Sequence, residues 1–285
     1  MVTIFRTKRL HTNTNIFILS VALLDCFMAV SDFVQGIIYS TAVKINIHNT
    51  NVMDAILFGT GYSAITLSCT HMAIIAIDRY VNIAHPFYYI LNITKRRVIV
   101  LLLIAWMFGL VYCSVPIILY RDGKYHAKCI SVHPPFEYFI TNVLLNIIDY
   151  VIIFICYFKI SCLAFQHKKA ANARRLQTEN PTNVFKLRNN RAAAMKSVKF
   201  FVLLFGTFFV FTCPQMLTQG MVFLSCSIPE NVVFFMGNLY DVHSAMNWVI
   251  YFHFNKGFSD GFKRLLSDMS TFGRKPCGGC DRRNN

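Results

Sequence analysis

The stretch that decides the fold is Ile74-Ile75-Ala76-Ile77-Asp78-Arg79-Tyr80-Val81, which closes an apolar run and is followed by His85-Pro86. An acid, an arginine and a tyrosine in succession at the end of a hydrophobic helix have a physical use. The Arg79 guanidinium can pair with the adjacent Asp78 carboxylate while the helices stay together. When neighbouring helices move apart, the long arginine side chain can reach into the opening. The triplet therefore indicates a helix end that takes part in a conformational change.

Long apolar segments surround this stretch and place the chain in a membrane. Of its 285 residues, 55% are hydrophobic and 14% are charged. Soluble domains are less apolar and about 25% charged, so a soluble enzyme and a disordered chain are disfavoured. Ten cysteines scattered along so long a chain do not indicate a small disulfide scaffold. A bilayer is spanned by about 20 mostly apolar residues, and six stretches qualify: Ile16–Thr41, Ala55–Ile77, Val98–Leu119, Phe136–Phe165, Val198–Leu224 and Val232–Phe254.

The net charge of +15 comes from 28 Lys and Arg against 13 Asp and Glu. Most of the basic residues fall in connections on one side of the predicted membrane, at 6–9, 95–97, 168–199 and 256–283. The positive-inside rule places these connections in the cytoplasm. The charge is therefore an orientation signal and does not indicate nucleic-acid binding. Lys256–Met269 is amphipathic and predicts a helix on the membrane surface, followed by a cytoplasmic tail over 270–285.

In this context the Asp78-Arg79-Tyr80 triplet resembles the signature of the rhodopsin-like (class A) G-protein-coupled receptors. Further family landmarks fall in order and in register: Asp25, Trp106, Tyr157, Phe208, Pro214 and Asn247-Trp248-Val249-Ile250-Tyr251. The resemblance implies an all-α membrane protein whose six stretches are helices 2–7 of a seven-transmembrane bundle. Residues 1–269 would form that bundle, with 1–9 as the remnant of helix 1 and 256–269 as its surface helix. The subfamily stays unassigned, with some likeness to the melanocortin and adenosine receptors.

The resemblance also implies a set of activation and coupling residues: Asp78, Arg79, Tyr80, Tyr157, Phe208, Pro214, Asn247 and Tyr251. Three positions depart from the family's pattern. Thr212 replaces the helix-6 tryptophan, Trp248 replaces the helix-7 proline, and Ala194 replaces the helix-6 acid that can hold the arginine. Asp78 is then the remaining predicted restraint on Arg79, so we expect raised basal signalling if the bundle forms.

Acidic side chains at bilayer depth cost about 3 kcal/mol or more, which makes each of them a candidate for function. A sodium pocket like that of the family is implied for four residues: Asp25, Ser68, Ser244 and Asn247. There a cation would favour the inactive packing. The alternative is a protonated, hydrogen-bonded Asp25 without an ion. No other metal and no organic cofactor is expected.

Two further acids, Asp32 and Asp241, should line a cavity nearer the extracellular side and make it negative. A cationic ligand or a basic peptide group would satisfy them, and carboxylates bonded to hydroxyls or water are an equal alternative. Gly61 matches the aspartate of amine receptors and Asp241 matches the retinal lysine of opsins, so both ligand classes are discounted. The remaining expected lining is Tyr62, Ile65, Thr141, Asn142, Gln215, Gln219, Gly237 and Tyr240.

The cysteines follow the family only in part. Asp54 stands where the family has its helix-3 cysteine, so the usual disulfide cannot form. A bridge between Cys129 and Cys226 or two free thiols remain as alternatives. Cys277 and Cys280 follow the amphipathic segment, where S-palmitoylation is favoured over a metal or redox pair.

We therefore expect a plasma-membrane receptor that binds an extracellular ligand of unknown class and activates a heterotrimeric G protein. Catalysis is disfavoured because the sequence has no evident nucleophile–base set or metal-ligand cluster. A truncated, signalling-incompetent receptor fragment is an alternative, since most of helix 1 is not found before Arg9. A six-span channel or carrier is a remote alternative, because no pore loop or repeated halves are recognisable.

Overall fold

The computed structural model describes residues 13–45, 51–119, 127–128, 131–132, 135–175, 202–222, 224, 226–254, 259–264 and 267. The expected helix-1 remnant at 1–9, the tail at 270–285 and three cysteines (Cys129, Cys277 and Cys280) lie outside these residues. The described part comprises the helical bundle with some of its connections.

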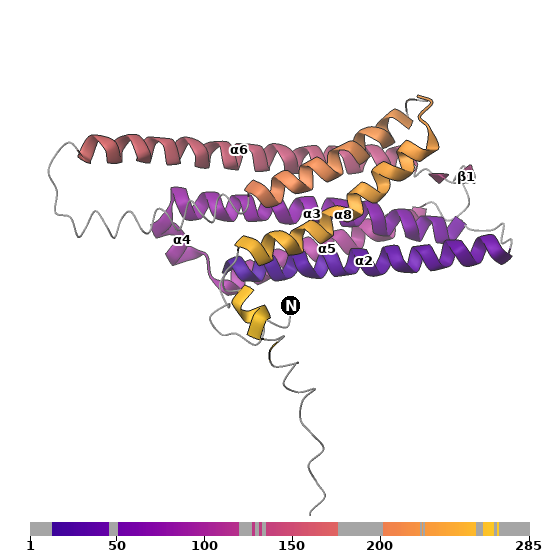
Figure 1. Cartoon of the computed structure of the whole chain (residues 1–285), viewed down its shortest axis with the longest axis horizontal. Helices are drawn as coiled ribbons and strands as arrows, with labels where there is room; N and C mark the ends of the chain where they lie inside the picture. The colour runs from indigo at the N-terminus through magenta and orange to yellow at the C-terminus, as the bar shows by residue number, and fades with distance from the viewer. Residues whose placement is uncertain are drawn as a thin grey trace, which may run out of the picture.

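Long helices run side by side through the molecule, and each contains the described part of one predicted span (Figure 1). They are α2 (Asn13–Ile45), α3 (Asn51–Ala84), α5 (Lys95–Leu119), α6 (Phe136–Arg175), the helix Val202–Val222 and α8 (Glu230–Phe254). Five of them are long and apolar enough to cross a membrane; α8 has the length but carries Asn238, Asp241, His243 and Asn247 among its apolar residues. The all-α membrane fold predicted from the sequence is confirmed.

Two short elements were not predicted. One is an antiparallel pair of two-residue strands, β1 (Ala127–Lys128) and β2 (Ser131–Val132). The other is α4 (Pro86–Asn92), which starts directly after α3. A residue before proline is disfavoured in a helix, and His85 leaves the helical conformation at φ −131° and ψ 65°. Proline is well tolerated in a first helical turn, so Pro86 ends one helix and begins the next.

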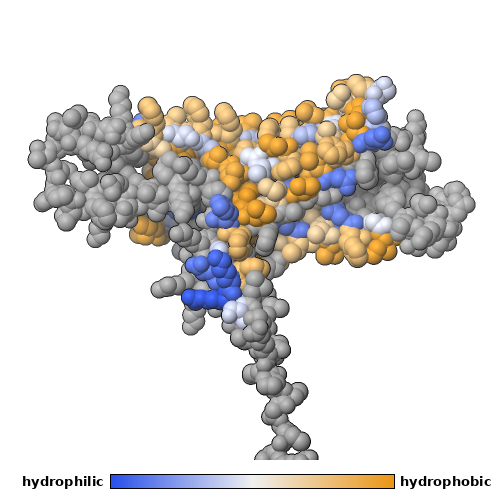
Figure 2. All heavy atoms as spheres, viewed as in Figure 1, coloured by the Kyte–Doolittle hydropathy of each residue, from blue (hydrophilic) through white to orange (hydrophobic). Residues whose placement is uncertain are grey.

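The central position in the bundle belongs to α3. In the apolar part of α3, 72% of the residues are buried, whereas 22–33% of the residues are buried in the apolar parts of the other four membrane-length helices. It packs against α2, α5 and α6, and the main core cluster joins Met72 and Ile75 of α3 to Phe17, Ile153 and Phe208. Large apolar side chains cover the outside of the bundle, as the broad orange surface in Figure 2 shows. A polar face turned inward and an apolar face turned outward suit a lipid surround.

The two ends of the bundle carry different features (Figure 1). We call the end with Arg79 and α4 the Arg79 end; β1 lies at the opposite end. The described part of the predicted surface helix, residues 259–264, is helical and lies at the Arg79 end. Its Phe262 ring lies 5.9 Å from Phe252 of α8, while Lys263 and Arg264 are exposed. The segment thus has one packed face and one basic exposed face, as its amphipathic pattern predicts.

Candidate functional site

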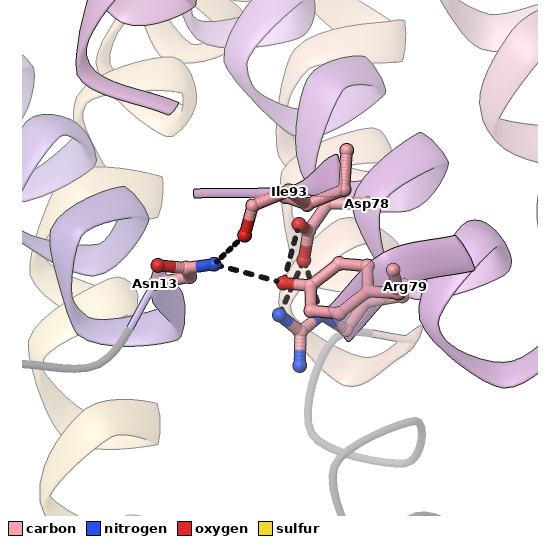
Figure 3. A network of polar contacts seen from close by, with 5 residues as sticks. Asn13, Asp78, Arg79 and Ile93 are labelled. Atoms are coloured by element: carbon pink, nitrogen blue, oxygen red, sulfur yellow. Dashed lines mark hydrogen bonds and ion pairs between the residues drawn. The ribbon is translucent and has the colours of Figure 1, made fainter. Parts of the chain in front are cut away.

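The triplet at the end of α3 forms a buried ion pair. Asp78 and Arg79 are 8% and 6% exposed, and Arg79 Nε donates to Asp78 Oδ2 at 2.9 Å. Arg79 Nη2 also contacts the same carboxylate oxygen, which makes the pair bidentate from the arginine side (Figure 3). A hydrogen-bonded pair of opposite charges satisfies two groups that would otherwise be costly to bury. The arrangement matches the resting geometry predicted for the triplet.

A second layer of polar side chains holds the Asp78 carboxylate. The Tyr89 hydroxyl of α4 donates to Asp78 Oδ1 at 2.8 Å. Asn13 Nδ2, at the start of α2, donates to the Tyr89 oxygen and to the Ile93 carbonyl, both at 3.3 Å (Figure 3). Burial raises the pKa of the Tyr89 hydroxyl, and the neighbouring Asp78 carboxylate raises it further. This network joins α2, α3 and α4, and it was missed because α4 was not predicted.

The other predicted activation residues lie along α6, the 202–222 helix and α8. Tyr157 is half-buried and its ring stacks with Phe205 at 6.4 Å. Phe208 is fully buried, with its ring 5.3 Å from His243. Pro214 is half-buried within the 202–222 helix. The backbone of Tyr251 belongs to α8, and its side chain is outside the described set.

The acid of α2 contacts α8. Asn247 Nδ2 donates to both carboxylate oxygens of Asp25, at 3.2 Å each. Ser68 of α3 is 3% exposed, and the Ser244 side chain is not described. Asn247 Oδ1 is buried and has no hydrogen-bond partner. A carboxylate and an orphaned amide oxygen are hard oxygen ligands of the kind that an alkali cation takes, so the Asp25–Asn247 contact fits the implied sodium ion.

Two of the predicted ligand-pocket residues, Tyr62 and Ile65, belong to different packed clusters. Tyr62 lies with other aromatic side chains, its ring 6.0 Å from Tyr138 and 6.3 Å from Phe139. Ile65 belongs to a different cluster, with Met28 and Ala64 and with Met216 beside them. Asn142 is fully buried and donates to the Tyr62 carbonyl at 3.0 Å and to Thr66 Oγ1 at 2.7 Å.

Thr141 is not brought together with this set. It is exposed, and its hydroxyl donates to the Glu137 carbonyl of its own helix at 2.7 Å. One step along an α-helix turns the side chain by about 100°, which separates Thr141 from buried Asn142. The remaining predicted lining residues are half-buried, namely Asp32, Gln215, Gln219 and Gly237, or have side chains outside the described residues, namely Tyr240 and Asp241.

A buried network that sequence reasoning missed connects α5, α2 and α3. Trp106 Nε1 donates to Ser20 Oγ at 3.0 Å, and Ser20 Oγ lies 2.9 Å from His71 Nε2. His71 Nδ1 lies 2.7 Å from the Leu67 carbonyl, which can only accept. A proton on Nδ1 therefore leaves Nε2 of neutral His71 to accept from Ser20. Each donor between the Trp106 indole and the Leu67 carbonyl then makes one hydrogen bond.

Asp149 also finds a partner that the sequence did not reveal. Thr70 Oγ1 of α3 donates to its Oδ2 at 2.8 Å.

Cys226 is exposed and carries a free thiol, while Cys129 lies beyond the described part of the chain. Where the structure describes the chain, no group of three His, Cys, Asp or Glu residues is arranged to hold a metal ion.

Comparisons with known proteins agree on one family. Residues 1–251 match the family described as 7 transmembrane receptor (rhodopsin family). An octopamine receptor beta-2R of Chilo suppressalis is 24% identical, over 94% of this chain and 74% of its own length. A lysophosphatidic acid receptor 1-A of Xenopus laevis is 25% identical, over 95% and 71%. A 5-hydroxytryptamine receptor 1B of Spalax ehrenbergi is 27% identical over 43% of this chain and 31% of its own. The names cover chemically different ligands, so the similarity assigns no ligand.

Proposed function

Because the chain belongs to the rhodopsin family of seven-transmembrane receptors, the class A G-protein-coupled receptors, we propose that it activates heterotrimeric G proteins through Arg79 when an extracellular ligand binds. It is a multi-pass membrane receptor and not an enzyme. The observation that carries the proposal is the buried Arg79–Asp78 pair at the end of α3. Both partners come from one helix, so a change in the neighbouring helices can free the arginine without unfolding α3.

The Arg79 end faces the cytoplasm in this proposal. Its support is the charge distribution, since the basic segments at 6–9, 95–97, 168–199 and 256–283 flank the span ends on that side. The helix that moves would be Val202–Val222, which packs on α6 through Phe205 and Tyr157. Its inward face at Thr212 is held by the Tyr150 hydroxyl at 3.1 Å. Sodium at Asp25 would favour the resting packing of α2 against α8.

The ligand, by the same inference, carries a positive charge. Asp32 of α2 is half-buried in the membrane-spanning part of the bundle and has no hydrogen-bond partner among the described residues. A cation would satisfy it. A screen of basic peptides and other cationic ligands against the wild type and the Asp32→Asn variant tests this: a hit that keeps its potency on the variant contradicts the role of Asp32.

Coupling is tested without a ligand by guanine-nucleotide exchange on a panel of purified heterotrimeric G proteins, using membranes that contain the full chain. We expect exchange above that of receptor-free membranes. Arg79→Ala should abolish it, and Asp78→Asn should raise it by releasing the arginine. Arg96→Ala, which removes an exposed guanidinium at the start of α5, is the matched control.

Surface expression is measured for each variant, so that a misfolded variant is recognised. Full exchange by a well-expressed Arg79→Ala variant contradicts the proposed mechanism. A well-expressed wild type that stimulates none of the G proteins contradicts raised basal activity.

A further inference from the structure

An open groove lies at the Arg79 end, between the last turns of α3 and residues 158–166 of α6. Tyr80 and Ala84 line one wall, and Phe158, Lys159, Leu163 and Gln166 line the other. Apolar groups thus form most of its walls. Tyr80 belongs to the predicted coupling residues, whereas the α6 wall of the groove has no part in the proposed coupling.

The groove carries one positive charge that has no ion-pair partner among the described residues. The Lys159 ammonium lies 5.6 Å from the centre of the Tyr80 ring, which positions the charge without neutralising it. No carboxylate of the described residues is within ion-pair distance of Lys159. Lys159 is exposed, and α6 continues past it to Arg175. Lys159 lies two helical turns before Gln166, where the apolar span ends, and a lysine side chain is long enough to extend from there toward the headgroups.

An apolar track leads from the groove along α6 toward the membrane interior. Phe154 and Phe158 stack with ring centroids 6.2 Å apart and an interplanar angle of 16°. Their side chains are 69% and 61% exposed, so the rings contact the medium that surrounds the bundle. A partner that fits both features has an anionic head and a hydrocarbon tail.

We propose that the groove binds one anionic phospholipid, with the phosphate on Lys159 and an acyl chain along Phe154 and Phe158. Such a lipid bridges α3 and α6 beside the triplet. Anionic phospholipids are concentrated in the cytoplasmic leaflet, so the assignment uses the orientation given under the proposed function. The binding test does not depend on coupling, because a nanodisc presents the lipid to both ends of the bundle and needs no G protein.

The test measures how many lipids stay bound to the full chain by native mass spectrometry after release from nanodiscs of phosphatidylcholine with phosphatidylserine. We expect one phosphatidylserine to be retained in preference to phosphatidylcholine. Lys159→Gln should weaken its retention about fivefold, which is what one basic side chain near an anionic surface contributes. Ala84→Leu should weaken it as well, because it fills the groove without changing the charge. Lys95→Gln removes an exposed lysine that does not line the groove, so it should change retention of the single groove lipid less than Lys159→Gln does.

Other occupants give different results. Equal retention by wild type and Lys159→Gln, each with an unchanged unfolding temperature, overturns the proposal. Displacement by glycerophosphoserine as effectively as by the intact lipid overturns the acyl-chain part, since a free phosphate ester has no tail. A Lys159→Gln variant that keeps its lipid but loses nucleotide exchange makes the groove a protein contact instead. If the wild type retains phosphatidylserine in preference to phosphatidylcholine but stimulates no nucleotide exchange, the result contradicts the coupling proposal and not the lipid proposal.

Discussion

Asn247 of α8 donates from Nδ2 to both carboxylate oxygens of Asp25 of α2, although the two residues are 222 positions apart in the chain. The contact joins the first and the last of the long described helices. It also leaves the buried Asn247 Oδ1 without a partner. A carboxylate beside an orphaned amide oxygen offers two of the oxygen ligands that an alkali cation takes.

Sodium should stabilise the protein through Asp25. The unfolding temperature in detergent should be higher in sodium chloride than in an equal concentration of potassium chloride, because binding to the folded state alone raises stability. Asp25→Asn should remove the difference. Asp149→Asn is the matched control, since that carboxylate is bonded to Thr70 between α3 and α6. Retention of the sodium increment by Asp25→Asn would place the ion elsewhere.

The Trp106–Ser20–His71 chain should be cooperative. Ser20→Ala leaves the indole N–H and His71 Nε2 without partners, and each buried unsatisfied group costs about 1–3 kcal/mol. Trp106→Phe leaves the Ser20–His71 bond in place. A double-mutant cycle by denaturing-detergent titration should therefore give a coupling energy of about 0.5–3 kcal/mol. Additive effects of the two substitutions would show that the chain does not act as a unit.

Two glycines of α3 should respond in opposite ways to the same substitution. A Cβ on Gly59 would lie 2.3 Å from the Cys113 backbone carbonyl oxygen, whereas one on Gly61 meets no atom within 4 Å. Gly59→Ala should destabilise by about 1–3 kcal/mol, as overpacking does. Gly61→Ala should be neutral or stabilise by about 0.5–1 kcal/mol, because alanine favours a helix. Equal unfolding free energies would contradict the close approach of α3 and α5.

Tyr89 should give the fold a dependence on alkaline pH. Burial and then the Asp78 carboxylate raise the pKa of its hydroxyl above the ordinary value of 10.0. The folded state therefore holds this proton more tightly, so the stabilisation is complete below pH 10.0 and is lost as the pH rises through the raised pKa. Near neutral pH, Tyr89→Phe should cost about 1 kcal/mol for the lost hydrogen bond.

Unfolding temperatures measured across the alkaline range check this expectation. The stability lost above pH 10.0 should be smaller in Tyr89→Phe than in the wild type. Tyr88→Phe is the matched control, because Tyr88 is 57% exposed on the same short helix and takes no part in the network. Wild-type pH dependence in the Tyr89→Phe variant would assign the alkaline transition to other groups.

The long helices could be predicted from the sequence and the short helix α4 could not, because the signal used was the length of an apolar run. Spanning a bilayer requires about 20 apolar residues, a signal too long to miss. The seven-residue helix Pro86–Asn92 contains no such run. The structure was needed to place it, and with it the contact of Tyr89 with Asp78. The Arg79–Asp78 pair was predictable because its members are adjacent in the chain.

The sequence by itself determined which long segments are helical, which residues are polar within them and which family the chain resembles. Only the tertiary structure decided which polar groups meet: Asn247 with Asp25, Trp106 with Ser20 and His71, Thr70 with Asp149. Helical periodicity puts the neighbours Thr141 and Asn142 on different faces of α6, and only the packing decided that Asn142 is the buried one. Helical periodicity sets the angle between side chains on one helix. The rotation and depth of that helix against its neighbours come from packing around α3, and those two quantities decide every contact between helices.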